Sequence, residues 1–257
     1  MFYYVEYTLN TMQTKSSSHP RFAAIDALRG LAIFMMFVFH FNFDLVYFGY
    51  SQQDFYHDPF WLNFRVVIVS TFLAVMGISL YLAHHQGFRR RHYLRRLAYV
   101  GICAALVSVS SYLMFPRSMI FFGILHFITL ASVLGPLFLR FYWLNLVLGI
   151  GLIIAGNLIR HPLFDHPALQ WLGMMTHKPI TEDYVPLLPW FGVVLLGMFG
   201  AKWAYSRAHF PLIWQWQGND ILSQGLRFAG RHSLIIYMLH QPFFIGSLYL
   251  VKMLSTA

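Results

Sequence analysis

The sequence predicts an all-α fold, a polytopic membrane helix bundle of about seven transmembrane helices. The composition is 58% hydrophobic and only 11% charged, well outside the balance of soluble proteins. Apolar runs of about 20 residues, the length of a membrane-spanning helix, recur along the chain. The predicted spans cover residues 22–48, 62–84, 97–115, 119–139, 141–160, 185–205 and 230–254.

The domain organisation follows from the short connections and the absence of a tandem repeat. Residues 21–257 are expected to form a single transmembrane domain. Residues 1–20 are polar and aromatic and lack the apolar core of a secretory signal, so we expect a disordered N-terminal tail. Cys103 is the only cysteine, which excludes a disulfide framework and a metal–thiolate site. No histidine and carboxylate spacing fits a metal site, and no metal is expected.

The distribution of positive charge predicts the orientation. With the N-terminus inside, thirteen Lys and Arg residues fall at cytoplasmic ends and five at the opposite ends. Cytoplasmic loops carry such an excess, so we expect N-in, C-out topology in a multi-pass protein of the inner (plasma) membrane. The net charge of +9 then serves orientation in the lipid bilayer, and no nucleic-acid partner is expected. A homo-oligomer remains open.

The first span carries a polar stripe. At 100° per residue, Asp26, Arg29, His40 and Asp44 lie within an arc of about 60° and extend over about 27 Å of helix. Ionisable groups at membrane depth are costly and usually mark a site or a pathway. Asp26 and Arg29 can neutralise each other, and Asp44 can fix one nitrogen of His40 and leave the other as a general base. A structural stripe that joins helices is the alternative interpretation.

Other polar side chains interrupt later spans. His126 lies in the fourth predicted span, and Tyr237, His240 and Gln241 lie along one face of the last. We interpret them, with Asp26, as candidates for lining a substrate pocket, and His126, Tyr237 and His240 as donors to an oxyanion. Ordinary interhelical hydrogen bonding remains the alternative for each of them.

The first span resembles the opening helix of integral-membrane acyltransferases through the pattern Arg-x4-Asp-x2-Arg-Gly-x9-His, from Arg21 to His40. Two groups share it, the acyltransferase-3 family and the heparan-α-glucosaminide N-acetyltransferase family. Further segments look most like small bacterial members of the second group, and the last two are common to both: Phe72–Leu80, Phe122–His126, Leu188–Gly192, Gly230–Leu234 and Tyr237–Pro242. The resemblance covers roughly residues 20–250.

The resemblance implies acyl transfer from acetyl-CoA or another acyl-CoA, on the cytoplasmic side, to an amine or hydroxyl of a sugar or glycan across the membrane. In the acyltransferase-3 family the histidine that ends the first helix is catalytic, which maps onto His40. In the heparan enzymes a loop histidine shortly before a Trp is catalytic, and His57 before Trp61 is its counterpart here. The spacing favours His40.

The phosphates of the acyl-CoA are expected to pair with Arg29, Arg95 and Arg96, because guanidinium groups match phosphate in a bidentate fashion. A different class of protein, a proton-coupled transporter or flippase-like protein that relays protons through its histidines, is the alternative function. Internal repeats and broken helices in both halves are typical of transporters, and the sequence shows neither. A third alternative, a non-catalytic membrane scaffold, does not explain the polar stripe of the first span.

Overall fold

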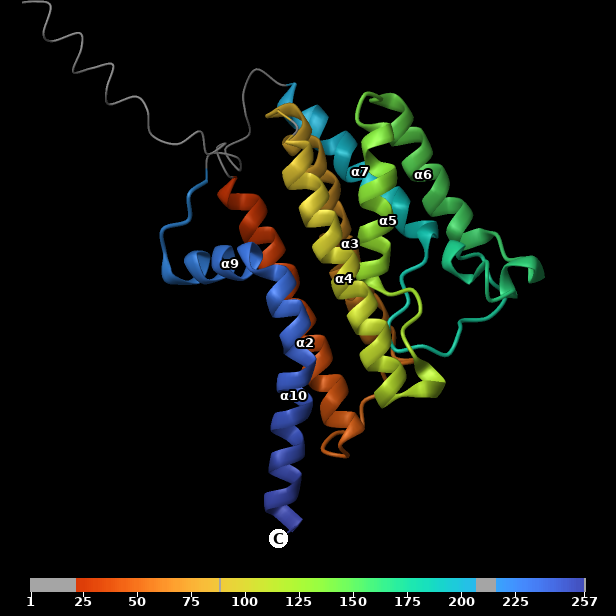
Figure 1. Ribbon diagram of the computed structural model, residues 1–257, viewed down its shortest axis with the longest axis vertical. Coiled ribbons are helices and arrows are strands. Elements are labelled where there is room, and N and C mark those ends of the chain that lie inside the picture. The colour runs from red at the N-terminus through yellow and green to blue at the C-terminus, as the bar shows by residue number, and fades with distance from the viewer. Residues whose placement is uncertain (1–21, 88, 207–215, 257) are drawn as a thin grey trace, which may run out of the picture.

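The structure is a computed structural model that describes residues 22–87, 89–206 and 216–256. Within these residues all regular structure is helical (Figure 1). The α-helices are α2 Ala23–Tyr47, α3 Pro59–His85, α4 Arg90–Met114, α5 Ile124–Leu134, α6 Trp143–Leu158, α7 Leu187–Tyr205, α9 Ile221–Arg231 and α10 Ser233–Thr256. The 3-10 segments are Pro116–Ser118, Gly135–Phe138, Pro162–Asp165 and Gln170–Leu172. The predicted tail at residues 1–20 and Arg21 lie outside the described residues.

Five of the described helices, α2, α3, α4, α7 and α10, are long and apolar enough to cross a membrane. α5, continued by the 3-10 segment to Phe138, and α6 are apolar but shorter. The all-α membrane bundle is therefore confirmed, whereas the count of seven spans stays a prediction. α2 and α10 lie side by side and run in the same direction, and the short α9 lies across them (Figure 1).

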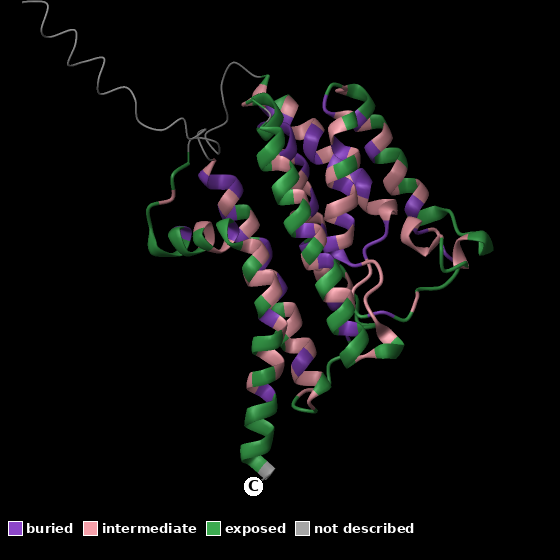
Figure 2. Ribbon diagram, in the orientation of Figure 1, coloured by how far each residue is buried: buried purple, intermediate pink, exposed green. Residues whose placement is uncertain are grey.

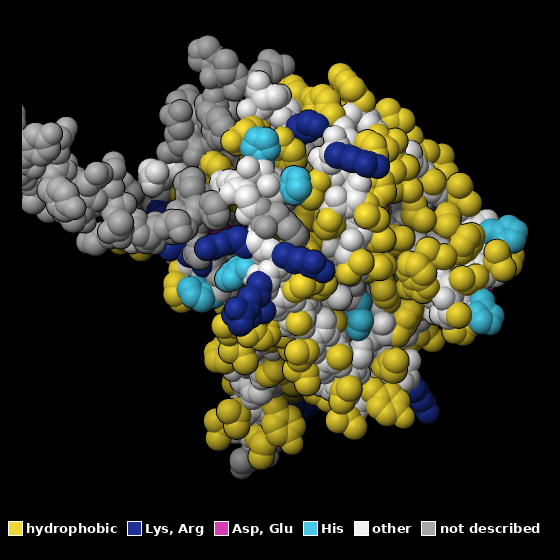
Figure 3. Space-filling view, turned by 45° about the horizontal axis from the view of Figure 1, so that its top comes forward, with side chains coloured by type: hydrophobic (Ala, Val, Ile, Leu, Met, Phe, Trp, Pro, Cys, Tyr) yellow, Lys and Arg dark blue, Asp and Glu magenta, His cyan; other side chains and the backbone are white. Residues whose placement is uncertain are grey.

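Positive side chains gather at one end of the bundle, where α2 begins and α3 ends (Figure 3). Among the described residues, ten Lys and Arg lie there: Arg29, Arg89, Arg90, Arg91, Arg95, Arg96, Arg140, Lys202, Arg227 and Arg231. The opposite end holds five: Arg65, Arg117, Arg160, Lys178 and Lys252. The asymmetry agrees with the predicted orientation, and we refer to the two ends as inner and outer on that basis.

Glycines allow the helices to approach closely. A Cβ added at Gly77 on α3 would lie 2.1 Å from the carbonyl oxygen of Val194 on α7. A Cβ at Gly30 on α2 would lie 1.9 Å from the carbonyl oxygen of Leu226 on α9. Small residues at such crossings are a main source of helix association in membranes, because the surrounding lipid is itself apolar. These contacts fix α3 against α7 and α9 against α2.

The buried core lies between α3, α5 and α7, with Leu73, Phe127, Val194 and Met198 essentially inaccessible. Figure 2 shows burial concentrated there, while the outer half of α10 is largely exposed. α10 is therefore held chiefly along its inner half, by α2 and α9.

Replacing Gly77 with Ala is expected to lower the free energy of unfolding by about 1–3 kcal/mol, because the new methyl group overlaps backbone that cannot move aside. Gly151 on α6 is the matched control, since nothing lies within 4 Å of its added Cβ. Gly151→Ala should leave stability unchanged or raise it by up to about 1 kcal/mol. Thermal unfolding in detergent compares the two, and equal effects would contradict the proposed crossing.

Candidate active site

The polar residues of the first and last predicted spans meet at the interface of α2 and α10. The side-chain amide nitrogen of Gln241 lies 3.0 Å from Nδ1 of His40. The rings of His40 and His240 have centroids 5.0 Å apart, and Nδ1 of His240 donates to the carbonyl oxygen of Tyr237 at 2.5 Å. We call His40, Asp44, Tyr237, His240 and Gln241 the α2–α10 polar cluster.

The predicted partner of His40 is wrong. Gln241, rather than Asp44, forms the hydrogen bond to the imidazole, although Asp44 lies one helical turn away on α2. Asp44 is buried at 4% exposure and interacts with Gln241. The helical spacing places Asp44 near His40, but the amide of Gln241 on the neighbouring α10 forms the hydrogen bond to the ring nitrogen. The amide donates to Nδ1, so the hydrogen of a neutral His40 resides on Nε2.

Aromatic rings surround the cluster. Phe37 stacks on His240 with centroids 5.9 Å apart, and Phe244 meets the same ring edge-on at 6.0 Å. Phe39 contacts His40 edge-on at 5.5 Å. These apolar rings lower the local dielectric around the cluster, which strengthens each polar interaction within it.

His57 lies in the outer loop before α3, with a side chain 85% exposed. Its Nδ1 lies 2.8 Å from Oδ2 of Asp54. The other carboxylate oxygen of Asp54 accepts from the backbone N–H groups of Tyr56 and His57. These hydrogen bonds, first that from Tyr56 and then that from the His57 ring, lower the pKa of Asp54 below its usual value. The carboxylate thus stays ionised and orients the imidazole, whose Nε2 faces outward without a described partner.

An aromatic stack joins this loop to α2. Phe55 is buried and contacts Trp61 at a centroid distance of 4.3 Å and Phe39 at 5.3 Å. Asp58 caps the start of α3 by accepting from the N–H of Phe60. Because Phe39 also touches His40, the rings of Phe55 and Phe39 link the loop that carries His57 to the α2–α10 polar cluster.

At the inner end, Asp26 bridges two arginines, with Arg29 and Arg231 each 3.3 Å away. This confirms the predicted pairing of Asp26 with Arg29. Arg29 also donates to Ser79 Oγ at 2.9 Å and to the carbonyl of Gly230 at 3.3 Å. The guanidinium therefore binds α2 to α3 and α9, so protein partners already occupy much of the group that was predicted to contact phosphate.

Arg95 and Arg96 lie exposed near the start of α4 and form no hydrogen bond within the described part of the chain. Arg96 is close enough to Arg29 for the two charges to interact. Both side chains are thus free to receive an anion at the inner end. Their role in phosphate binding stays a prediction.

His126 has protein partners on both ring nitrogens. Nδ1 accepts from the N–H of Gly123 at 3.3 Å, and Nε2 lies 3.0 Å from Ser108 Oγ, which donates to the carbonyl of Ile120 at 2.6 Å. The three contacts agree with a single tautomer in which Nε2 carries the hydrogen. In this arrangement His126 fastens α4 to the start of α5, and no hydrogen bond joins it to the α2–α10 polar cluster among the described residues.

Asp183, which is not among the site residues predicted from the sequence, connects α5 to α10. Its Oδ2 accepts from the N–H of Ile124, the first residue of α5, at 2.8 Å and from the hydroxyl of Tyr237 at 3.4 Å. Arg65 and Lys178 are the nearest cations. Gly123 precedes α5 and has no side chain to cap it. The sequence signal was therefore an uncapped helix start, but its partner lies 59 residues away.

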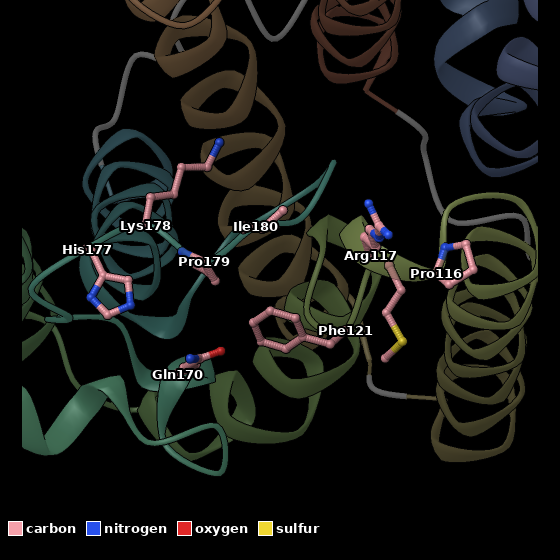
Figure 4. A pocket seen from close by; sticks show the side chains of 9 residues that line it. Pro116, Arg117, Phe121, Gln170, His177, Lys178, Pro179 and Ile180 are labelled. Atoms are coloured by element: carbon pink, nitrogen blue, oxygen red, sulfur yellow. The ribbon is translucent and has the colours of Figure 1, made fainter.

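A cavity of about 350 Å³ opens at the outer end beside this network (Figure 4). Its lining includes Arg117, Phe121, Gln170, His177 and Lys178, which come from the connections between α4 and α5 and between α6 and α7. Lys178 also lies 5.9 Å from the centre of the Tyr56 ring, in the loop that carries His57. The cavity thus combines an aromatic ring, an amide and positively charged groups near the exposed histidine loop.

No group of three or more His, Cys, Asp and Glu able to hold a metal ion occurs among the described residues. The apolar helices, the polar cluster between α2 and α10 and the histidine–aspartate pair in the outer loop together indicate a multi-pass membrane protein with polar groups inside its bundle. The sequence profile of the heparan-alpha-glucosaminide N-acetyltransferase catalytic family matches residues 21–242. The chain belongs to this family, and membership implies acetyltransferase activity. Comparison with curated proteins and with solved structures gave no match.

Replacing Asp183 with Ala is expected to lower the free energy of unfolding by about 1–3 kcal/mol, because the N–H of Ile124 and the hydroxyl of Tyr237 lose their acceptor. Glu182, the exposed neighbour, is the matched control, and Glu182→Ala should stay within about 0.5 kcal/mol of the wild type. Thermal unfolding in detergent measures both. A neutral Asp183→Ala variant would show that α5 is capped in another way.

Proposed function

We propose that the protein is an integral-membrane acyltransferase that moves an acetyl or acyl group from acyl-CoA, bound from the inner end, to an amine or hydroxyl of a sugar at the outer end. The observation that carries the assignment of the base is the 2.8 Å contact between His57 Nδ1 and Asp54. An imidazole held by a carboxylate on one nitrogen and free on the other is the arrangement that general-base catalysis requires. The family match supports the reaction class.

His57 rather than His40 is therefore our choice for the base. The sequence predicted a carboxylate partner for His40, but the histidine that has one is His57, which pairs with Asp54. His40 accepts a hydrogen bond at Nδ1 and so offers an N–H at Nε2. Such an N–H suits the stabilisation of a developing negative charge on oxygen or sulfur better than the removal of a proton.

The donor substrate enters, in this proposal, at the positively charged inner end. Arg95 and Arg96 are exposed there and match the phosphates of CoA. Arg29 lies close to Arg96, and His40 follows eleven residues later, about 16 Å further along α2. The pantetheine arm of acyl-CoA is a long chain that can extend along α2 from Arg29 toward His40. Phosphates held at the inner end then place the thioester near the α2–α10 polar cluster.

The chemical step transfers one acyl group and one proton. The acceptor nitrogen or oxygen attacks the thioester carbonyl carbon while His57 Nε2 takes the acceptor proton. The carbon–sulfur bond then breaks, and the CoA sulfur leaves with a proton returned from the imidazole. The acceptor sugar is expected to approach through the outer cavity, where Phe121 can stack against a sugar face and Gln170 can bond its hydroxyls. Placement in the inner (plasma) membrane is part of the proposal.

Replacing His57 with Ala is expected to reduce transfer from acetyl-CoA to D-glucosamine by about 10²- to 10⁴-fold, the usual contribution of a general base. Asp54→Asn should cause a smaller loss, because the ring loses its orientation but keeps its proton-accepting nitrogen. Release of the free thiol of CoA by purified protein in liposomes measures the rate.

His166→Ala is the matched control, since His166 is another exposed loop histidine, whose Nδ1 accepts only from the N–H of Ala168. Its rate should equal that of the wild type. A His57→Ala variant with unchanged rate, together with an inactive His40→Ala variant, would transfer the role of base to His40.

A further inference from the structure

The α2–α10 polar cluster contains buried acceptors that the protein leaves without a partner. Among the described residues, five buried side-chain polar atoms lack a hydrogen bond, and three of them are Asp44 Oδ2, His240 Nε2 and Gln241 Oε1. Asp44 and His240 are 4% and 6% exposed. An unpaired buried polar atom costs about 1–3 kcal/mol, so three in one interface need a reason.

The hydrogen bonds that these side chains do make determine what they still offer. The carbonyl of Tyr237 can only accept, so Nδ1 of His240 carries the hydrogen and a neutral ring presents a lone pair at Nε2. Gln241 donates its amide nitrogen to His40 and keeps its oxygen as an acceptor. A carboxylate oxygen of Asp44 also accepts. The cluster thus offers three acceptors beside the single N–H of His40.

The four side chains are close enough to act on one group. His40 contacts Gln241 directly and lies 5.0 Å from His240 between ring centroids, and Asp44 interacts with Gln241. Phe37 covers one face of the His240 ring, and Phe244 meets that ring edge-on. A ligand that satisfies this arrangement must bring hydrogen-bond donors into an apolar, aromatic enclosure.

We propose that Asp44, His240 and Gln241 form a membrane-embedded binding site for an N–H or O–H group of a substrate, with His240 Nε2 as one acceptor of its hydrogen bonds. This inference rests on the proposed function and deepens it. The same chemistry occurs in two places: the amide N–H groups of the pantetheine arm of acyl-CoA, and the amino or hydroxyl groups of the acceptor sugar.

Two substitutions test the site by removing acceptors while conserving shape. His240→Phe keeps a ring between Phe37 and Phe244, and Asp44→Leu keeps a side chain of similar size. In ligand-free protein both are expected to leave the midpoint of thermal unfolding unchanged or to raise it, because the unpaired buried atom that each removes offsets the one hydrogen bond that it loses, to Gln241 or to Tyr237. Ser247→Ala is the control on α10, since Ser247 already donates to the carbonyl of Phe243 and should not raise it.

Substrate binding distinguishes the two sources of the donor group. If the site holds the pantetheine arm, both variants weaken acetyl-CoA binding by roughly tenfold in titration calorimetry, about the loss of one buried hydrogen bond. If it holds the acceptor, acetyl-CoA binding is unchanged and the KM for D-glucosamine rises by a similar factor. Ser247→Ala changes neither quantity.

Two outcomes overturn the proposal. A fall of several degrees in the unfolding midpoint of both ligand-free variants would show that the polar atoms stabilise the fold. Unchanged acetyl-CoA affinity together with an unchanged KM for D-glucosamine would show that they bind no substrate. If the wild type itself fails to bind acetyl-CoA, the proposed function fails. The unfolding midpoints of the ligand-free variants still decide whether the cluster is a binding site or a structural contact.

Discussion

The polar stripe of α2 must find hydrogen-bond partners in an environment that supplies no water, and the arrangement of the other helices depends on how each group is satisfied. In lipid, an unpaired polar atom cannot turn to solvent, so neighbouring helices must provide its partner. At the inner end that demand is met in full, by Ser79 from α3 and by the carbonyl of Gly230 and Arg231 from α9. The close approach at Gly30 is what allows α9 to reach these groups.

Further along the same helix the demand is met only in part. His40 has Gln241, but Asp44 Oδ2, His240 Nε2 and Gln241 Oε1 have no hydrogen-bond partner among the described residues. One stripe therefore has two functions, a structural ion-pair network at its inner end and an incompletely bonded cluster deeper in. Arg29 is thus held by protein partners at the inner end, whereas we propose that the deeper cluster beside His40 receives a substrate group.

Much of this arrangement was predictable from local sequence, and the rest depended on contacts between distant residues. Helical periodicity placed Asp26 and Arg29 together, and they pair as expected, because both lie on one helix. Periodicity also placed Asp44 near His40, yet the ring bonds to Gln241, which lies 201 residues away. No local pattern in the sequence predicts which of the other helices packs against this part of α2. The same limit applies to Asp183, which caps α5 although it lies 59 residues from Ile124 in the sequence.

The two candidate histidines are best understood as parts of one path rather than as rivals. Phe39 touches His40, and through Phe55 and Trp61 it supports the loop that holds His57 beside Asp54. An acceptor group that loses its proton at the outer loop and a thioester that arrives from within must meet close to this aromatic stack. In the proposed mechanism the exposed His57, oriented by Asp54, takes the proton of the acceptor sugar, while the aromatic rings shield the thioester from water that would compete with that sugar. The proposal therefore gives each histidine a role of its own, His57 as the base and His40 as a hydrogen-bond donor.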